Sequence, residues 1–153
     1  MRPISEDRVT IVRLIDTDVL VVAVNQHDPR HDVTRAFMER VLSDSSANLI
    51  ASASIVGFIR NVTRFVRGLP GLPVGSAFDL AEDWLRRSTV SVPIPDERHF
   101  ARVRELLEGA GVSGKHVDDA HLAALAMQYR ATIVTFDTDF ARFPGVKWER
   151  PAA

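Results

Sequence analysis

Residues 117–139, VDDAHLAALAMQYRATIVTFDTD, decide the fold. Two aspartates stand near the start of this stretch, and the run of alanine and leucine behind them predicts a helix over residues 117–130. The β-branched residues that follow predict a buried strand over residues 132–136, which ends at Asp137. A helix that leads so soon into a strand is typical of an α/β fold with parallel strands.

The rest of the chain repeats this alternation of strands and helices. We therefore predict an α/β sandwich of three layers, with a mostly parallel central sheet flanked by helices. No linker or repeat divides residues 1–153, so we predict one domain, with residues 1–10 as a ragged N-terminal extension. The other predicted strands cover residues 10–15, 48–51, 90–94 and 146–148, and the other predicted helices cover residues 28–42, 52–66, 76–85 and 96–109.

The composition fits a compact globular domain and excludes several kinds of chemistry. Hydrophobic residues make up 46% of the chain, which is enough for a core without covalent cross-links. There is no cysteine, so disulfides, thiolate metal sites and cysteine nucleophiles are excluded. The longest apolar stretch, residues 19–24, is too short to cross a bilayer, and no signal-peptide pattern opens the chain. We therefore expect a cytoplasmic protein with no membrane partner.

Aspartates lie where predicted strands end and a predicted helix begins, and these positions are expected to meet at one edge of the sheet. Asp16 closes the first predicted strand, Asp137 closes a later one, and Asp118 and Asp119 open a helix. In a parallel α/β sheet, ligands bind beyond the carboxyl ends of the strands. Carboxylates that gather there repel one another, and a hard divalent cation such as Mg²⁺ or Mn²⁺ removes this repulsion. The sequence therefore predicts a metal site that includes Asp16, Asp119 and Asp137.

Each of these aspartates also has a purely structural explanation. Asp118 and Asp119 compete for the N-cap of their helix, so we expect one to cap or support while the other binds metal. Asp137 and Asp139 lie in a turn-rich stretch, where aspartate is common. An acid at the end of a buried strand is harder to explain as a surface charge, so we favour a functional role for Asp16.

Asp18 and a set of arginines are weaker candidates. Asp18 follows Asp16 by two residues, so either both side chains share one strand face or Asp18 caps the next turn. Arg60, Arg64 and Arg67 recur at helical spacing and predict a basic stripe on one helix. Such a stripe is usually a solvated face, but it would also let a chain of net charge −1 contact RNA phosphates.

The five histidines form no recognisable metal site in the sequence. Only His27 and His31 stand four residues apart, and without a third ligand nearby we interpret them as surface or capping residues. His116 and His121 flank the aspartate pair, and we interpret His121 as a packed helix residue. The sequence therefore assigns no metal role to a histidine.

Four segments resemble motifs of one known family. Residues 14–20, LIDTDVL, resemble the opening motif of PIN domains, with an aspartate in the place of an asparagine. Residues 117–126, VDDAHLAALA, resemble the family's Asp-Ala-His-Leu-Ala-Ala motif. Residues 131–145, ATIVTFDTDFARFPG, resemble its late Thr-x-Asp-x-Asp-Phe segment, and residues 58–63, FIRNVT, resemble its third helix. The similarity covers nearly the whole chain, which resembles the PIN-domain toxins of VapC type.

The resemblance implies a PIN-like fold and a specific activity. Proteins of this type are Mg²⁺-dependent endoribonucleases, the toxin components of type II toxin–antitoxin systems, and they form homodimers that a small cognate antitoxin silences. The resemblance makes Asp16, Asp119 and Asp137 the catalytic metal ligands, supported by Asp139 and Thr135. We expect a metal-activated water to hydrolyse an RNA phosphodiester, leaving a 5′-phosphate and a 3′-hydroxyl.

One departure from the family pattern leaves alternatives open. Many members carry a glutamate on the third helix, and here Gly57 or a neighbour takes its place. A first alternative is therefore a weakened or inactive PIN module that binds RNA or antitoxin without cutting. A second is a phosphatase of haloacid-dehalogenase type, in which Asp16 of the Asp16-Thr17-Asp18 sequence is the nucleophile. The glycine and threonine that usually follow this sequence are absent here.

Overall fold

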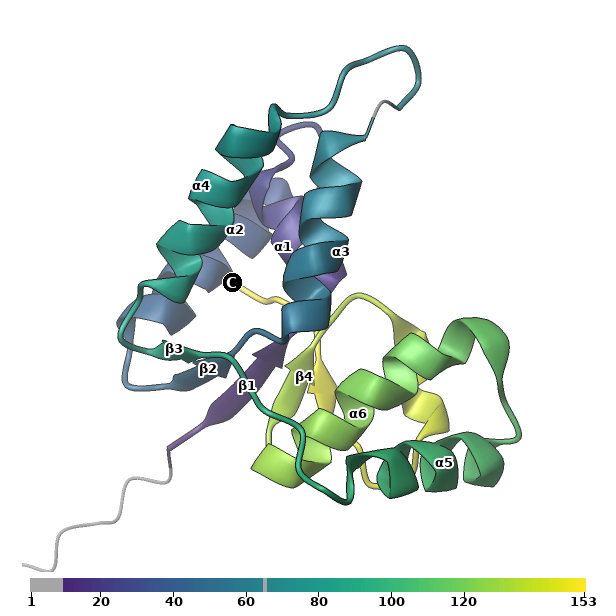
Figure 1. Cartoon of the computed structure of the whole chain (residues 1–153). Coiled ribbons are helices and arrows are strands. Elements are labelled where there is room, and N and C mark those ends of the chain that lie inside the picture. Colours follow the sequence, from purple (N-terminus) through teal and green to yellow (C-terminus); the bar gives the residue numbers. More distant parts are fainter. Residues whose placement is uncertain (1–9, 65) are drawn as a thin grey trace, which may run out of the picture.

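A parallel sheet of five strands forms the centre of the molecule (Figure 1). The computed structural model describes residues 10–64 and 66–153, so all but the last residue of the predicted N-terminal extension lies outside the described residues. The strand order is β3-β2-β1-β4-β5, and every neighbouring pair is parallel, which confirms the predicted sheet. The strands are β1 (Val12–Ile15), β2 (Ala47–Leu49), β3 (Val90–Ser91), β4 (Thr132–Val134) and β5 (Trp148–Glu149).

Helices cover both faces of this sheet. They are α1 (Thr17–Val24), α2 (His31–Ser43), α3 (Ser52–Thr63), α4 (Val74–Leu85), α5 (His99–Ala110) and α6 (Val117–Tyr129), with two short 3-10 helices, η1 (Gly114–His116) and η2 (Thr138–Arg142). Figure 1 shows α1 to α4 together on one side of the sheet and α5 and α6 on the other, so the three-layer prediction is confirmed. Within the described residues, no helix has the length and apolar character needed to cross a membrane.

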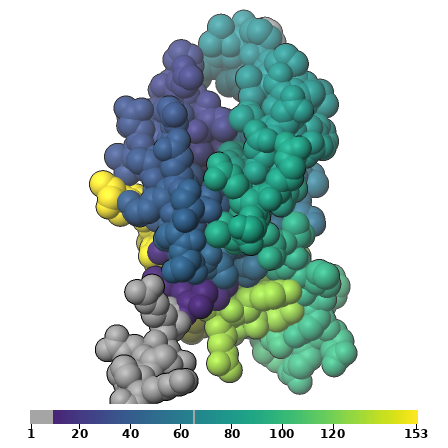
Figure 2. Space-filling view, turned by 90° about the vertical axis from the view of Figure 1, so that its left-hand side faces the viewer, coloured from purple at the N-terminus to yellow at the C-terminus, as the bar shows by residue number. Residues whose placement is uncertain are grey.

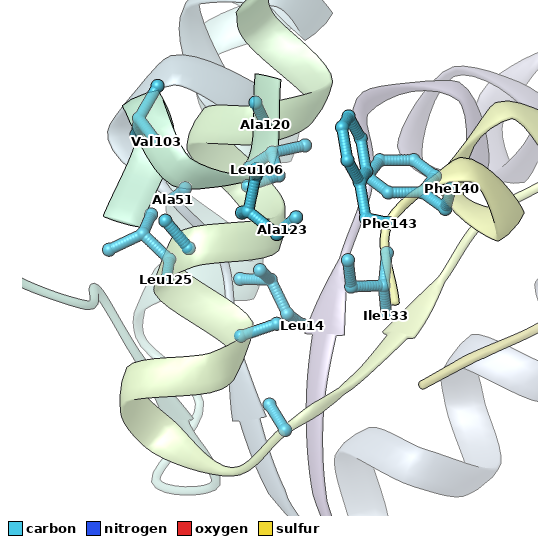
Figure 3. Close-up of a cluster of buried hydrophobic side chains, with 14 of the residues drawn as sticks. Leu14, Ala51, Val103, Leu106, Ala120, Ala123, Leu125, Ile133, Phe140 and Phe143 are labelled. Carbon is cyan, nitrogen blue, oxygen red and sulfur yellow. The ribbon is translucent and has the colours of Figure 1, made fainter. Parts of the chain in front are cut away.

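Successive side chains of the central strands enter two separate cores. Leu14 and Ile133 pair across β1 and β4 and pack in the core that α5, α6 and η2 cover. The next residues, Ile15 and Val134, pack in the core that α1 to α4 cover. Figure 3 shows Phe140 of η2 in the same core as Ile133, and its side chain is fully buried. The short helix η2 is thus held in place by the apolar side chain at its centre.

The last residues of the chain lie against the helical layer. Figure 2 shows α2 and α4 side by side on one face of the molecule, with the C-terminal residues next to α2. Arg40 of α2 donates a hydrogen bond to the Ala152 carbonyl oxygen at 3.0 Å. This contact joins the C-terminus to the layer that packs above the sheet.

Helix α1 directly follows β1, and the sequence pattern does not predict it. Asp16 is the N-cap residue of α1, and its Oδ1 accepts a hydrogen bond from the Thr17 backbone N–H at 2.7 Å. Asp18 therefore lies in the first turn of a helix, and the expectation that it shares a strand face with Asp16 is wrong. The β-branched residues of α1 favour a strand by propensity, but the burial of Val19 and Leu20 against neighbouring helices overrides that preference.

The predicted basic stripe on the third helix is also wrong. Helix α3 ends at Thr63, and Arg64 continues in an extended conformation with φ −77° and ψ 151°. Arg67 has a left-handed φ of 50° and lies beyond the helix. The glycines and prolines of residues 68–75 end the helix earlier than its apolar pattern suggests. Of the three arginines, only Arg60 lies on α3.

The burial of Phe140 predicts a large loss of stability when its side chain is removed. We expect Phe140→Ala to lower the free energy of unfolding by about 3–5 kcal/mol, because the cavity left behind cannot collapse fully. Phe100→Ala is the matched control, since Phe100 is 80% exposed, and it should change the free energy by less than about 0.5 kcal/mol. Urea unfolding of both variants measures the difference, and equal effects would contradict this view of the core.

Candidate active site

Six aspartates line one cavity of about 630 Å³ beyond the carboxyl ends of β1 and β4. Residues from α1, α3 and α6 form most of its wall. The structure thus brings the three predicted metal ligands to one place, although they come from three separate stretches of the chain. The aspartates of the cavity are Asp16, Asp18, Asp28, Asp118, Asp119 and Asp137, and Asp28 is paired with Arg30.

Asp16 is the most tightly held of these acids. Its residue surface is 9% exposed, and Oδ2 accepts a hydrogen bond from the Thr135 hydroxyl at 2.8 Å. Burial raises the pKa of the Asp16 carboxyl, and the negative charge of Asp137 adds to this, against the lowering effect of the hydrogen bonds from Thr135 and Thr17. Thr135 is fully buried and does not line the cavity, so the structure places it beneath the site as a support.

Asp18 belongs to the same group, although it lies on a helix. Its Oδ2 accepts a hydrogen bond from the Phe136 backbone N–H at 3.0 Å and lies 3.4 Å from the Thr135 hydroxyl. Burial raises the pKa of Asp18 to about 7, and the nearby charge of Asp16 is the second cause. Its Oδ1 is buried without a hydrogen-bond partner, and a buried oxygen of this kind suits a bound cation or water.

Asp118 and Asp119 lie in the first turn of α6, and neither caps it. The N-cap residue is His116, which makes no side-chain capping bond, so the expectation that one aspartate caps the helix is wrong. Asp119 is partly buried, and burial raises the pKa of its carboxyl to about 7, with the charges of Asp137 and Asp16 as the next causes. Asp118 lines the cavity from an exposed position.

Asp137 and Asp139 lie at the start of η2. Asp137 is the N-cap residue of this short helix, and its Oδ1 accepts a hydrogen bond from the Asp139 backbone N–H at 2.8 Å. The Asp137 backbone N–H in turn donates to the Thr135 hydroxyl oxygen at 3.0 Å. Asp139 does not line the cavity, but its carboxylate approaches His116 at 3.8 Å. The cap therefore orients Asp137 without removing it from the cavity.

The third helix contributes no carboxylate to the described lining of the cavity. Its lining residues are Ala53, Ser54, Val56, Gly57, Arg60 and Asn61. A Cβ added to Gly57 would lie 3.0 Å from Cγ2 of Thr17, so any larger side chain there must displace Thr17 slightly. As the sequence indicates, α3 has no glutamate at this position. With a glycine there instead, the backbone of α3 lies close to α1. Arg64 and Arg67 do not line the cavity.

Sequence reasoning missed a second arginine at the cavity. Arg30 lines it, and its guanidinium forms an ion pair with Asp28 at 2.8 Å. The same group lies 4.3 Å from the centre of the Phe136 ring, a cation–π distance. Arg30 stands alone in the sequence between a proline and the helix α2, so no periodic pattern could have identified it. His31, interpreted as a surface or capping residue, is in fact buried, with Nδ1 2.9 Å from the Val22 carbonyl oxygen.

A family model decides the classification of this fold and site. The model described as the PIN domain matches residues 13–146, far more than half of the chain. The chain belongs to the PIN-domain family. The predicted family is therefore confirmed, and the aspartate-lined cavity is a feature of a PIN domain.

Curated relatives of this PIN domain carry the names of ribonucleases. Ribonuclease VapC37 of Mycobacterium tuberculosis is 33% identical over 142 residues, which cover 93% of this chain and 99% of the relative. Ribonuclease VapC43 of the same species is 33% identical over 138 residues, which cover 90% and 93% of the two chains. At this identity and coverage the chain is a member of the VapC group of PIN-domain proteins.

Solved structures share the PIN-domain architecture. A VapBC2 complex of Rickettsia felis bound to a promoter DNA fragment matches with a TM-score of 0.68 and 20% identity, covering 92% of this chain and 98% of the other. VapC20 of Mycobacterium tuberculosis, described as a toxin that cleaves the sarcin–ricin loop, matches with a TM-score of 0.65 and 18% identity, covering 88% and 98%. These matches establish that the fold is shared.

The raised pKa values predict how the stability of the metal-free PIN domain depends on pH. Asp18 and Asp119 have pKa values of about 7 in the folded protein against an ordinary value of 3.8, so the folded state binds more protons between these limits. Their contribution to stability is complete below pH 3.8 and is lost as the pH rises through about 7. With chelator present, we expect the melting temperature to fall between pH 5 and pH 8, on the order of a few degrees.

Two variants distinguish repulsion among the aspartates of the site from the titration of acids elsewhere in the protein. Asp119→Asn should raise the melting temperature of the metal-free protein at pH 8 and reduce its dependence on pH, because the amide carries no charge to repel Asp16 and Asp137. Asp79→Asn, on the exposed surface of α4, is the matched control and should leave the profile unchanged. Identical profiles for wild type and Asp119→Asn would contradict the repulsion among the acids.

Proposed function

We propose that this PIN domain is a divalent-metal-dependent endoribonuclease, the toxin component of a type II toxin–antitoxin system. The observation that carries this proposal is the convergence of Asp16, Asp119 and Asp137 at one cavity, in a chain whose relatives are named ribonucleases. In this proposal the three carboxylates are the catalytic metal ligands, with Asp18, Asp118 and Asp139 close by in support.

The side chains of the cavity fit a hard divalent cation. Carboxylate oxygens are the ligands that Mg²⁺ and Mn²⁺ prefer in proteins, and no thiolate is present in the chain. Burial and the charges of neighbouring aspartates raise the pKa values of Asp18 and Asp119. A bound cation would offset both effects. When bound, such an ion supplies charge stabilisation at a phosphodiester and lowers the pKa of a coordinated water.

The chain itself fixes the positions of its acids before any ligand binds. Thr135 and the Thr17 backbone N–H hold both oxygens of Asp16, and the Phe136 backbone N–H holds one oxygen of Asp18. The donors are the two residues that directly follow β4 and the first residue of α1. Asp16 and Asp18 are therefore held in place before any ligand binds, and such preorganisation favours catalysis.

Two arginines give the same cavity a place for the RNA backbone. Arg60 of α3 is exposed, and Arg30 lies at the N-cap of α2, so a strand of RNA across the opening could place phosphates beside both. Arg30 is oriented by Asp28 and by the Phe136 ring, which favours a defined contact over a mobile one. In this proposal Arg30 and Arg60 contact the RNA backbone. They take the place of the arginine stripe on the third helix that the sequence predicted.

The proposed partners are an RNA substrate, a small cognate antitoxin and a second copy of the chain. The solved structures of similar fold include complexes named VapBC, which supports the antitoxin. Exposed apolar side chains gather between α3 and α4, where Leu69 is 67% and Val74 is 60% exposed. We assign this surface to the homodimer. These partners imply a cytoplasmic protein.

The first alternative, a module that binds RNA or antitoxin without cutting, is favoured by one observation. Helix α3 presents Gly57 and no acid to the cavity, so the site has one carboxylate fewer than many family members. The phosphatase alternative has no such support, because Asp18 lies in a helix and its carboxylate is held by the Phe136 backbone N–H. Membership of the PIN-domain family also favours a nuclease over a phosphatase.

A cleavage assay on total cellular RNA tests the proposal. We expect the purified, antitoxin-free protein to give discrete fragments with Mn²⁺ or Mg²⁺ and none with chelator. Asp16→Asn should reduce the rate by at least about 100-fold, because it removes a metal ligand and its charge. Asp79→Asn should cleave at the wild-type rate. Tight RNA binding without cleavage at any metal concentration would support the binding-only alternative instead.

A further inference from the structure

A second group of ligand atoms meets at the start of α6, beside the aspartate cavity. The Nδ1 atom of His116 lies 3.7 Å from Oδ2 of Asp119 and 3.8 Å from Oδ2 of Asp139. One ligand atom from each residue lies within 4.8 Å of the other two. Over residues 10–64 and 66–153, no other three histidine or acidic side chains approach one another this closely.

The histidine of this group is buried and lacks a partner. Its residue surface is 9% exposed, and Nδ1 is shielded from solvent without a hydrogen bond. Burying a polar atom that makes no hydrogen bond costs about 1–3 kcal/mol, so such an atom calls for an explanation. It points toward two carboxylates yet lies too far from either to share a hydrogen bond. An ion between the three side chains would give all of them a partner.

The fold holds these side chains in the positions that a shared ligand needs. His116 and Asp119 are three residues apart at the start of α6, so they lie on one side of the helix. Asp139 comes from η2, where its backbone N–H is bonded to Asp137 at 2.8 Å. Its Oδ1 faces Arg142 at 3.4 Å, which leaves Oδ2 on the side of His116. The start of α6 thus positions two of the ligand atoms, and the contacts of η2 orient the third.

The distances suit a cation with short bonds to nitrogen and oxygen. A tetrahedral ion with bonds of about 2.1 Å holds its ligand atoms about 3.4 Å apart. The two nitrogen–oxygen distances, 3.7 and 3.8 Å, exceed this only slightly, and side-chain rotations can close the difference. The nitrogen ligand decides the kind of ion, because imidazole favours transition metals while Mg²⁺ prefers oxygen alone.

We propose that His116, Asp119 and Asp139 form a second cation position that takes a transition-metal ion such as Zn²⁺ in preference to Mg²⁺. Asp119 is common to this position and to the proposed catalytic set, so the inference deepens the proposed metal-dependent function. Neither the sequence spacing nor the four family-like segments assign a ligand role to His116. The metal-binding region of this PIN domain then has two parts. The aspartate cavity offers oxygen ligands alone, and the second position adds the nitrogen of His116.

Metal binding, measured without RNA, tests the proposal directly. The metal-free full chain is titrated with Zn²⁺ or with Mg²⁺ while the nitrogen resonances of the histidine rings are followed by NMR. We expect Zn²⁺ to shift the Nδ1 resonance of His116 and Mg²⁺ to leave it in place. An unchanged His116 resonance at saturating Zn²⁺ overturns the proposal.

Calorimetry on variants assigns the ligands. His116→Gln should weaken Zn²⁺ binding by at least about tenfold and leave Mg²⁺ binding unchanged. Asp139→Asn should weaken Zn²⁺ binding by the same factor. His27→Gln is the matched control, because His27 is exposed and is none of the three proposed ligands, and it should bind Zn²⁺ as the wild type does. Asp139→Asn keeps the test valid if the buried His116→Gln fails to fold. Zn²⁺ affinity equal to wild type in a folded variant contradicts the proposal.

The outcome does not depend on whether the chain cleaves RNA. Asp16→Asn leaves all three proposed ligands in place, so it should keep the Zn²⁺ response of His116 while losing cleavage. A His116 response in a wild type that never cleaves RNA would refute the nuclease and retain the second cation position. Cleavage without a His116 response would support the nuclease and refute the second cation position.

Discussion

The site depends on holding several negative charges together at the carboxyl edge of a parallel sheet. Carboxylates so close to one another are unfavourable, and burial makes them more so, as the raised pKa values of Asp16, Asp18 and Asp119 show. The structure resists this repulsion with a fully buried hydroxyl, that of Thr135, and with backbone N–H groups at the start of α1 and after β4. The two apolar cores on either side of the sheet keep these elements in register.

The sheet, the family and the main acids could be predicted because each depends on local sequence. The alanine-rich stretch of residues 117–126 and the β-branched strand after it predicted the helix α6 and strand β4 to within a few residues. In a parallel sheet, strand ends meet at one edge, so the positions of Asp16 and Asp137 along the chain indicated their meeting in space. Thr135 was found through the family motif, and the structure gives it a physical task beneath Asp16.

The parts that could not be predicted depend on contacts between distant residues. Helix α1 is composed mainly of β-branched residues, and only its packing among α2 and α3 makes it helical. Arg30 reaches the cavity from the N-cap of α2 and lies over the ring of Phe136, and a single arginine carries no periodic signal. The meeting of His116 with Asp139 joins residues from two short 3-10 helices that are far apart in the sequence, and the burial of Phe140 fixes the second of them, η2.

The central claim is that Asp16, Asp119 and Asp137 bind one divalent cation. A crystal structure of the protein grown with Mn²⁺, with anomalous diffraction measured near the manganese edge, tests it most directly. The account predicts an anomalous peak in the aspartate cavity, within about 2.0–2.3 Å of a carboxylate oxygen from each of the three residues. A well-ordered cavity without such a peak at saturating Mn²⁺, or a peak bound by none of the three, would contradict it.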